Sequence, residues 1–266
     1  MHGMEVDYYK KLFQTIGNII ELIEKDDIPK YLLFLENAFP YMDNYNYHKG
    51  MKGIIQELKV LLKTKSIGTN SDRALLLDFQ ATLEIKPEKA IKLEKDALAQ
   101  IENITADNAR LVSNLHANLG GLYRMNGHPD LAREHMEKSI SLLDQFNLLH
   151  INDSIPQIAN YAMFLTEQQE PERGISELQK LSGIIKEYHS DDCLDYAKVQ
   201  ETLGTIYLMT ANLPQAKTHF KRAFKIYEKI WADEPEMIEA KYQEIQELYP
   251  QIGFCIGKKL SGLLTK

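Results

Sequence analysis

The sequence of 266 residues predicts an all-α fold, a right-handed α–α superhelix (solenoid) of helix-turn-helix repeats with helical caps at both ends. The first observation is the segment 197–231, where two runs of apolar residues at helical spacing flank a short turn. The second is that the residues joining those two runs return every 42 positions. A helix pair of this kind cannot bury its apolar faces alone, so copies at a fixed step indicate stacked repeats.

The contact between the two helices of segment 197–231 combines small and aromatic side chains. Gly204 and Ala216 allow the two helices to approach closely, while Tyr207 and Phe220 fill the space beside them. A small residue recurs at the position of Ala216 in each copy; the series is Ala90, Ala132, Gly174 and Ala216. Prolines keep almost the same step, as suits the first turn of each second helix; they are Pro87, Pro129, Pro171 and Pro214.

This pattern resembles the tetratricopeptide repeat (TPR) family, in which a leucine-glycine pair, a following tyrosine, a turn glycine and alanines mark each repeat. The best matches are residues 118–140 and 202–226. The step of 42 residues exceeds the commoner step of about 34 and is similar to the longer repeats of kinesin light chains and many bacterial relatives. Two copies depart from the pattern, because Asp78 and Ala162 stand where glycine is usual and Glu94 stands where a large apolar residue is usual.

The predicted organisation has three parts. Residues 1–64 form an N-terminal helical cap or degenerate repeats, with helices expected over 5–24 and 50–63. Residues 71–232 hold four repeats that begin near 71, 113, 155 and 197. Residues 235–266 supply C-terminal capping helices, the last of which, over 252–264, is weakened by three glycines.

Composition excludes several classes of protein. A net charge of −7 disfavours nonspecific binding to nucleic acid or to an anionic membrane, because both need a basic surface. No stretch has the length of a membrane span, and the start shows no signal peptide. Cys193 and Cys255 form no disulfide framework, so we expect free thiols and a cytoplasmic location.

No catalytic or cofactor motif is found. The chain lacks a phosphate-binding loop, a dinucleotide fingerprint, an HExxH pair and a CxxC pair. His128 precedes Pro129 in a predicted turn, away from His135, and His116 is expected to be packed and hydrogen-bonded. We therefore expect no enzyme activity, no cofactor and no metal site.

The resemblance implies a binding groove on the first helix of each repeat, which lines the concave side of such superhelices. Carried over to this sequence, the side chains expected in the groove are Asn114, Asn118, Arg124, Asn160, Met163, Lys198, Thr202 and Thr205. Asn118 and Asn160 are 42 residues apart, at the place where family members hold the backbone of a ligand peptide. A carboxamide suits that task because it donates and accepts hydrogen bonds at once.

Two functions follow from the resemblance. The first is a non-enzymatic scaffold that binds an extended, partly apolar peptide, whose acidic end would be favoured by Arg124 and Lys198 and opposed by Glu201. The second is a regulatory sensor that resembles bacterial peptide-pheromone receptors but has no evident DNA-binding domain. Either partner is a protein or peptide rather than nucleic acid or membrane, and the sequence leaves a homodimer open.

Overall fold

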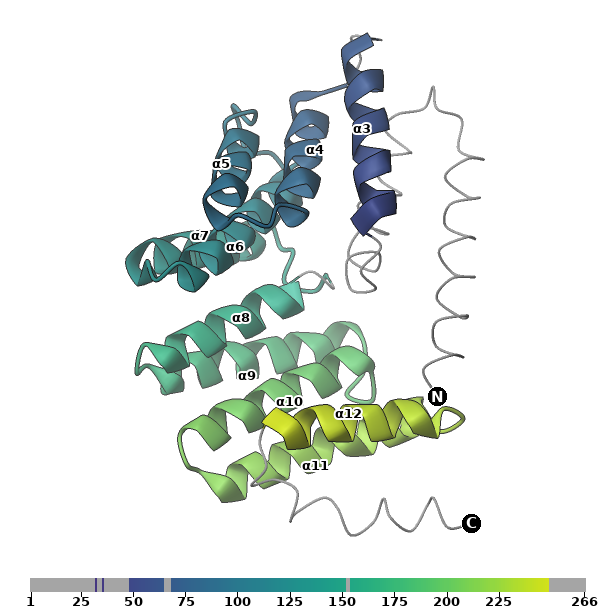
Figure 1. Ribbon diagram of the computed structural model, residues 1–266. Helices are drawn as coiled ribbons and strands as arrows, with labels where there is room; N and C mark the ends of the chain where they lie inside the picture. Colours follow the sequence, from purple (N-terminus) through teal and green to yellow (C-terminus); the bar gives the residue numbers. More distant parts are fainter. Residues whose placement is uncertain (1–31, 33–34, 36–47, 65–67, 152–153, 249–266) are drawn as a thin grey trace. The chain divides into compact units, whose positions relative to one another are not determined.

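The computed structural model describes residues 32, 35, 48–64, 68–151 and 154–248. Every element within these ranges is a helix and none is a strand, which confirms the all-α prediction for this part of the chain (Figure 1). The helices are α3 (His48–Thr64), α4 (Asn70–Thr82), α5 (Pro87–Leu98), α6 (Ala109–Met125), α7 (Pro129–Gln145), α8 (Ser154–Glu167), α9 (Pro171–Tyr188), α10 (Leu194–Met209), α11 (Leu213–Ile230) and α12 (Pro235–Leu248). The helices expected over 5–24 and 252–264 lie outside the described residues.

The chain divides into two compact units, Met1–Ser139 and Ile140–Lys266. In the first unit α4 packs against α5, α5 packs against α6, and α3 contacts α4. Among the described residues its core is mainly aliphatic and also contains the ring of Phe79; the residues buried in it include Met51, Leu58, Ala74, Ala97 and Leu115.

In the second unit α8 pairs with α9 and α10 pairs with α11, while α10 also contacts α8 and α9 (Figure 1). The core of this unit is richer in aromatic residues and includes Tyr196, Phe220, Phe224 and Tyr227. Trp231 and Tyr242 pack against it from the end of α11 and from α12. Helix α12 therefore covers apolar surface that the last helix pair would otherwise expose.

The second helices of the four pairs begin at a constant step. Helices α5, α7 and α9 begin with Pro87, Pro129 and Pro171, and α11 begins at Leu213 with Pro214 in its second position. Proline fits here because the first turn of a helix has no internal partner for its N–H groups. The helix starts therefore follow one register of 42 residues even where the proline moves by one.

Three of the turns inside the helix pairs share one backbone geometry. Gly127, Gln169 and Ala211, spaced by 42 residues, all have positive φ, at 73°, 65° and 58°. In each turn the N–H of the following residue donates to a carbonyl five residues back: His128 to Tyr123, Glu170 to Leu165 and Asn212 to Tyr207, at 2.9, 2.8 and 2.7 Å. This bond closes a Schellman motif and satisfies a carbonyl at the end of the first helix.

The close approach predicted at Gly204 is confirmed. A β-carbon there would lie 2.8 Å from the ring of Phe220, which is fully buried. A β-carbon on Gly120 would likewise lie 2.5 Å from the side chain of Met136. Tyr207 is only half-buried and stacks on His219, with 5.2 Å between the ring centroids, so it borders this contact rather than filling its centre.

Candidate functional site

The predicted groove residues of the first unit lie on one helix, α6. Its apolar side is buried through residues such as Leu115 and Leu119. The opposite side carries residues spaced by four, three and four positions, which we call the α6 stripe: Asn114, Asn118, Gly121 and Met125. Asn118 and Met125 are exposed, while Asn114 and, beside the stripe, Arg124 are half-buried. Asn114 and Asn118 therefore share one helix face, and Arg124 lies beside it.

Asn118 is tied to the neighbouring first helix. Its Nδ2 donates to Oδ1 of Asp78 on α4 at 2.8 Å. Asp78 in turn lies beside Glu94 of α5, and the two carboxyl groups are hydrogen-bonded. Three helices therefore meet at one polar cluster, which we call the Asp78–Glu94–Asn118 cluster.

Glu94 is the buried member of this cluster. Only 2% of its surface is exposed, and its Oε2 is a buried side-chain oxygen with no hydrogen-bond partner among the described residues. Burial, followed by the charge and hydrogen bond of Asp78, raises the pKa of Glu94 to about 10, while hydrogen bonding by Asn118 acts in the opposite direction. Glu94 is therefore protonated at neutral pH.

Asp78 and Glu94 each depart from the family pattern, but the sequence pattern did not predict their contact. Their positions correspond, at steps of 42, to Gly120 with Met136 and to Gly204 with Phe220. In those two repeats a glycine faces a large side chain that leaves no room for a β-carbon. The register therefore contained the signal that two unusual carboxyl groups would be placed face to face.

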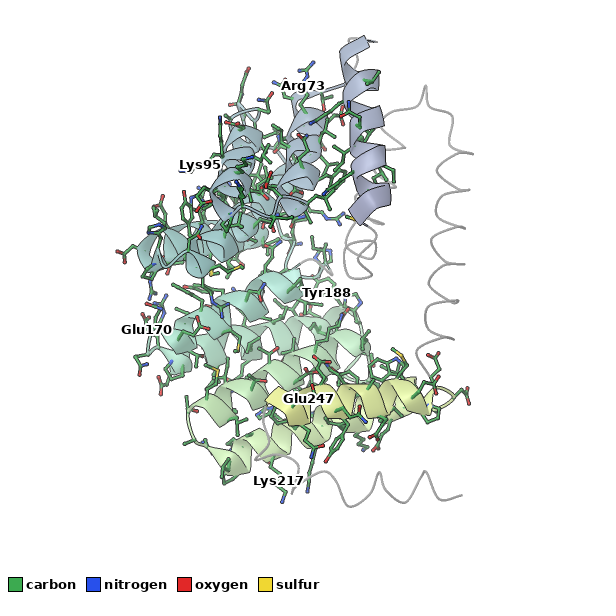
Figure 2. All side chains as sticks on the ribbon, viewed as in Figure 1. Arg73, Lys95, Glu170, Tyr188, Lys217 and Glu247 are labelled. Atoms are coloured by element: carbon green, nitrogen blue, oxygen red, sulfur yellow. The ribbon has the colours of Figure 1, made fainter. Side chains whose placement is uncertain are left out.

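A second polar cluster occurs in two repeats at the same register. In the first unit Nδ1 of His116 and Nδ1 of His135 are 2.9 Å apart, and the ring of Tyr123 stacks on His135. In the second unit Oε1 of Gln200 accepts from Nδ1 of His219 at 2.9 Å, and Tyr207 stacks on His219. The packed, hydrogen-bonded role expected for His116 is confirmed. Lys95, labelled in Figure 2, places its ammonium group 5.5 Å from the centroid of Tyr123.

Burial affects the charge of these histidines. It lowers the pKa of His116 to about 4, with further contributions from His135 and Lys138. Burial also lowers the pKa of His135, opposed by Glu134 and reinforced by Lys95. Both rings are therefore neutral at pH 7, one donating and the other accepting.

In the second unit, α8 is buried over most of its circumference. What remains outside is a narrow line that we call the α8 stripe, consisting of Pro156, Asn160, Met163 and Glu167. Asn160 is exposed at its centre, and Met163 is half-buried and packed against the core. The stripe thus offers one polar group beside adaptable apolar surface.

Helix α10, which contacts α8, carries the remaining predicted residues. Lys198 is exposed and lies 3.7 Å from the carboxylate of Asp195, one turn earlier. Thr202 and Thr205 are half-buried, and each donates its hydroxyl to a backbone carbonyl four residues back, at 3.0 and 3.1 Å. Each hydroxyl oxygen keeps lone pairs that can accept a hydrogen bond from a ligand.

Glu201 on α10 belongs to a network that sequence reasoning missed. Its Oε1 lies 2.9 Å from Nζ of Lys241 on α12, and its Oε2 accepts from the hydroxyl of Tyr227 at 2.6 Å. Burial lowers the pKa of Lys241 but the neighbouring Glu201 and Glu244 outweigh it, so the net change is upward. Lys241 compensates the negative charge that was expected to repel an acidic ligand. Because the residues are 40 positions apart on unlike helices, no local pattern indicates this contact.

The described residues contain no group of three or more histidine, cysteine or acidic side chains that could hold a metal ion. Among the same residues, no helix is both long and apolar enough to cross a lipid bilayer. The predicted residues fall in two sets, Asn114, Asn118 and Arg124 in the first unit and the other five in the second.

Residues 154–229 match the sequence model of the tetratricopeptide repeat family. No curated protein sequence matches the chain. Among solved structures, BtubC (BKLC) from P. vanneervenii is similar over 82% of this chain and 91% of its own, with 18% identity and a TM-score of 0.61. A putative kinesin light chain from Podosopora anserina with nearly identical TPR-like repeats is similar over 74% of this chain and 96% of its own, with 13% identity and a TM-score of 0.56.

Proposed function

Because tetratricopeptide repeats occupy residues 154–229 of an all-helical repeat fold, we propose that the protein is a non-enzymatic interaction module that binds an extended peptide along its first helices. Repeats of this type are in general a scaffold for protein partners rather than a catalytic fold. The two stripes and the exposed face of α10 are the surfaces that we assign to the peptide.

The α8 stripe is the observation that carries this proposal. A helix buried on nearly all sides can meet a partner only through its remaining strip, and Asn160 is the exposed carboxamide at the centre of that strip. A carboxamide pairs with a peptide group through one donor and one acceptor, so it holds a backbone without selecting a side chain. Met163 beside it suits an apolar side chain of the ligand.

Spacing supports an extended ligand. Thr202 stands 42 residues after Asn160, on the helix that contacts α8. Packed helices lie about 8 to 10 Å apart, and an extended peptide advances about 3.3 Å per residue. Asn160 and Thr202 would therefore engage peptide groups about three residues apart. Lys241 offsets the charge of Glu201. Lys198, whose ammonium group lies 3.7 Å from the Asp195 carboxylate, is exposed beside this surface and is the cation that we assign to an acidic group on the ligand.

Selection from a library of random nine-residue peptides tests the proposal. Peptides selected on the intact protein should bind the Asn160→Ala, Thr202→Val variant about tenfold more weakly, at an unchanged melting temperature. Gln179→Ala, an exposed polar residue on the second helix α9, and Lys217→Ala on α11 (Figure 2) are the matched controls and should bind as the parent does. If the Asn160→Ala, Thr202→Val variant binds the selected peptides with the affinity of the parent protein, this surface is excluded as the binding site.

A further inference from the structure

The Asp78–Glu94–Asn118 cluster places a polar contact where the 42-residue register puts an apolar contact between the helices of two other repeats. In two other repeats the corresponding residues are Gly120 against Met136 and Gly204 against Phe220, and neither pair offers a side-chain hydrogen bond. In the α4–α5 pair the corresponding residues carry two carboxyl groups, one with an oxygen that is buried and unpartnered. Burying a carboxyl group costs free energy, so an apolar pair would be the more stable choice at this point. The cluster is therefore better explained by what it does to its third member, Asn118.

The chemistry of the carboxyl groups determines which way the Asn118 carboxamide faces. Carboxyl oxygens accept hydrogen bonds, so the amide nitrogen of Asn118 turns toward Asp78. Its Nδ2 lies 2.8 Å from Oδ1 of Asp78. The two ends of a carboxamide point in opposite directions. Its oxygen consequently faces away from the cluster, on a side chain that is exposed.

We propose that Asp78 and Glu94 are positioning residues for the α6 stripe, which hold the nitrogen of Asn118 inward and present its oxygen to the ligand. The inference rests on the proposed function and narrows it: at Asn118 the ligand contributes a donor, namely a main-chain N–H. A carboxamide without this tie can rotate to pair with either a donor or an acceptor. Asn118 therefore fixes the register of the bound peptide.

Glu94 contributes by carrying a proton, because its burial and the neighbouring Asp78 disfavour its charged form. Its charged and polar neighbours are Asp78 on α4 and Asn118 on α6. With the proton on Glu94, Asp78 accepts one hydrogen bond from Glu94 and another from Asn118. Glu94→Gln replaces the protonated acid by a neutral amide of similar shape that can make the same donation, so this variant should retain the orientation of Asn118.

The sequence itself supplies the variant that removes the tie. Asp78→Gly with Glu94→Met reproduces the Gly120–Met136 pair of the next repeat, so the helix contact should remain packed while Asn118 loses its acceptor. Glu88→Gln, an exposed acid on α5, is the control.

The test scans a library-selected peptide with single N-methyl groups on its backbone. At one position of the peptide, N-methylation should lower the affinity of the parent protein about five- to tenfold, because it removes the N–H that donates to Asn118. The Glu94→Gln and Glu88→Gln variants should show the same loss of affinity on N-methylation. In Asn118→Ala and in the Asp78→Gly, Glu94→Met double variant, the loss should be below about twofold. An undiminished loss in the folded double variant would overturn the positioning role.

NMR of the Asn118 side-chain amide separates this inference from the proposed function, since it needs no peptide. The two amide protons should exchange with solvent more slowly than those of exposed Asn160, and the difference should vanish in the double variant. Equal exchange at Asn118 and Asn160 in the parent protein would refute the positioning role whether or not any peptide binds.

Discussion

Gly174 and Gly183 both lie on α9 but have opposite surroundings. A β-carbon on Gly174 would lie 2.6 Å from the backbone oxygen of Ala162, whereas one on Gly183 would meet nothing within 4 Å. The backbone of α8 cannot move aside as a flexible side chain can. The methyl group of an alanine at position 174 would therefore push α8 and α9 apart. Of these two glycines, Gly183 is the one that alanine can replace without a clash, and alanine is favoured over glycine inside a helix.

We expect Gly174→Ala to lower the free energy of unfolding by about 1 to 3 kcal/mol. Gly183→Ala should raise it by about 0.5 to 1 kcal/mol. Urea unfolding followed by circular dichroism measures both changes. A neutral or stabilising Gly174→Ala would mean that α8 and α9 are not in close contact at this point.

His116 provides a prediction about acid sensitivity. Its pKa and that of His135 are lower in the folded chain than the usual 6.5, so the unfolded chain binds more protons below pH 6.5. Stability therefore falls as the pH drops from about 6.5 toward 4, by at most about 1.4 kcal/mol per pH unit for each proton.

His116→Gln should reduce this loss, because it reproduces the Gln200–His219 pair of the second unit. A glutamine oxygen accepts from His135 whether or not that ring is charged, and it cannot itself take up a proton. Unfolding by urea at about pH 7, 6 and 5 should show a shallower decline than in the parent chain. His128→Gln, an exposed control, should follow the parent, and a parallel decline in His116→Gln would contradict this explanation.

At the scale of elements, the contact between α10 and α11 depends on two unequal rings. Phe220 is fully buried, while Tyr207 is half-buried and stacked on His219. Phe220→Ala should cost about 3 to 5 kcal/mol of stability. Tyr207→Ala, which removes less buried surface, should cost about 1 to 2 kcal/mol. Thermal unfolding of the two variants checks the order, and a larger loss for Tyr207→Ala would place the centre of the contact elsewhere.

Periodic packing made the helices predictable, whereas the turn geometry was only partly so. Small residues and prolines mark the contacts and helix starts, and both recur because every pair is built alike. The positive φ at Gly127 follows from its glycine, but Gln169 and Ala211 adopt the same conformation without one. There the helix pair imposes a backbone conformation that the residue itself disfavours.

The candidate site was less predictable than the fold. The helix faces on which Asn118 and Asn160 each lie follow from helical periodicity, and both side chains are exposed. The contacts that orient or neutralise the site join residues on different helices, such as Asp78 with Asn118 and Glu201 with Lys241. Such contacts depend on how helices stack, which single-helix patterns do not contain.

At the scale of the whole molecule, the proposed function assigns an extended ligand to polar groups on the first helices of each unit. Asp78 and Glu94 orient the polar group of the first unit, and Lys241 neutralises Glu201 in the second. A net charge of −7 requires such local compensation if an acidic peptide is to approach. The proposed function therefore depends on which helices an extended peptide contacts.

Paramagnetic broadening by a nitroxide-labelled, library-selected peptide identifies the helices that the peptide contacts. We expect the label to broaden NMR signals of Asn160 and of backbone amides on α8 and α10, while signals of Gln179 on α9 and Lys217 on α11 stay sharp. The diamagnetic, reduced label provides the reference intensities. Broadening confined to α9 and α11 would place the peptide on the second helices and contradict the proposed binding surface.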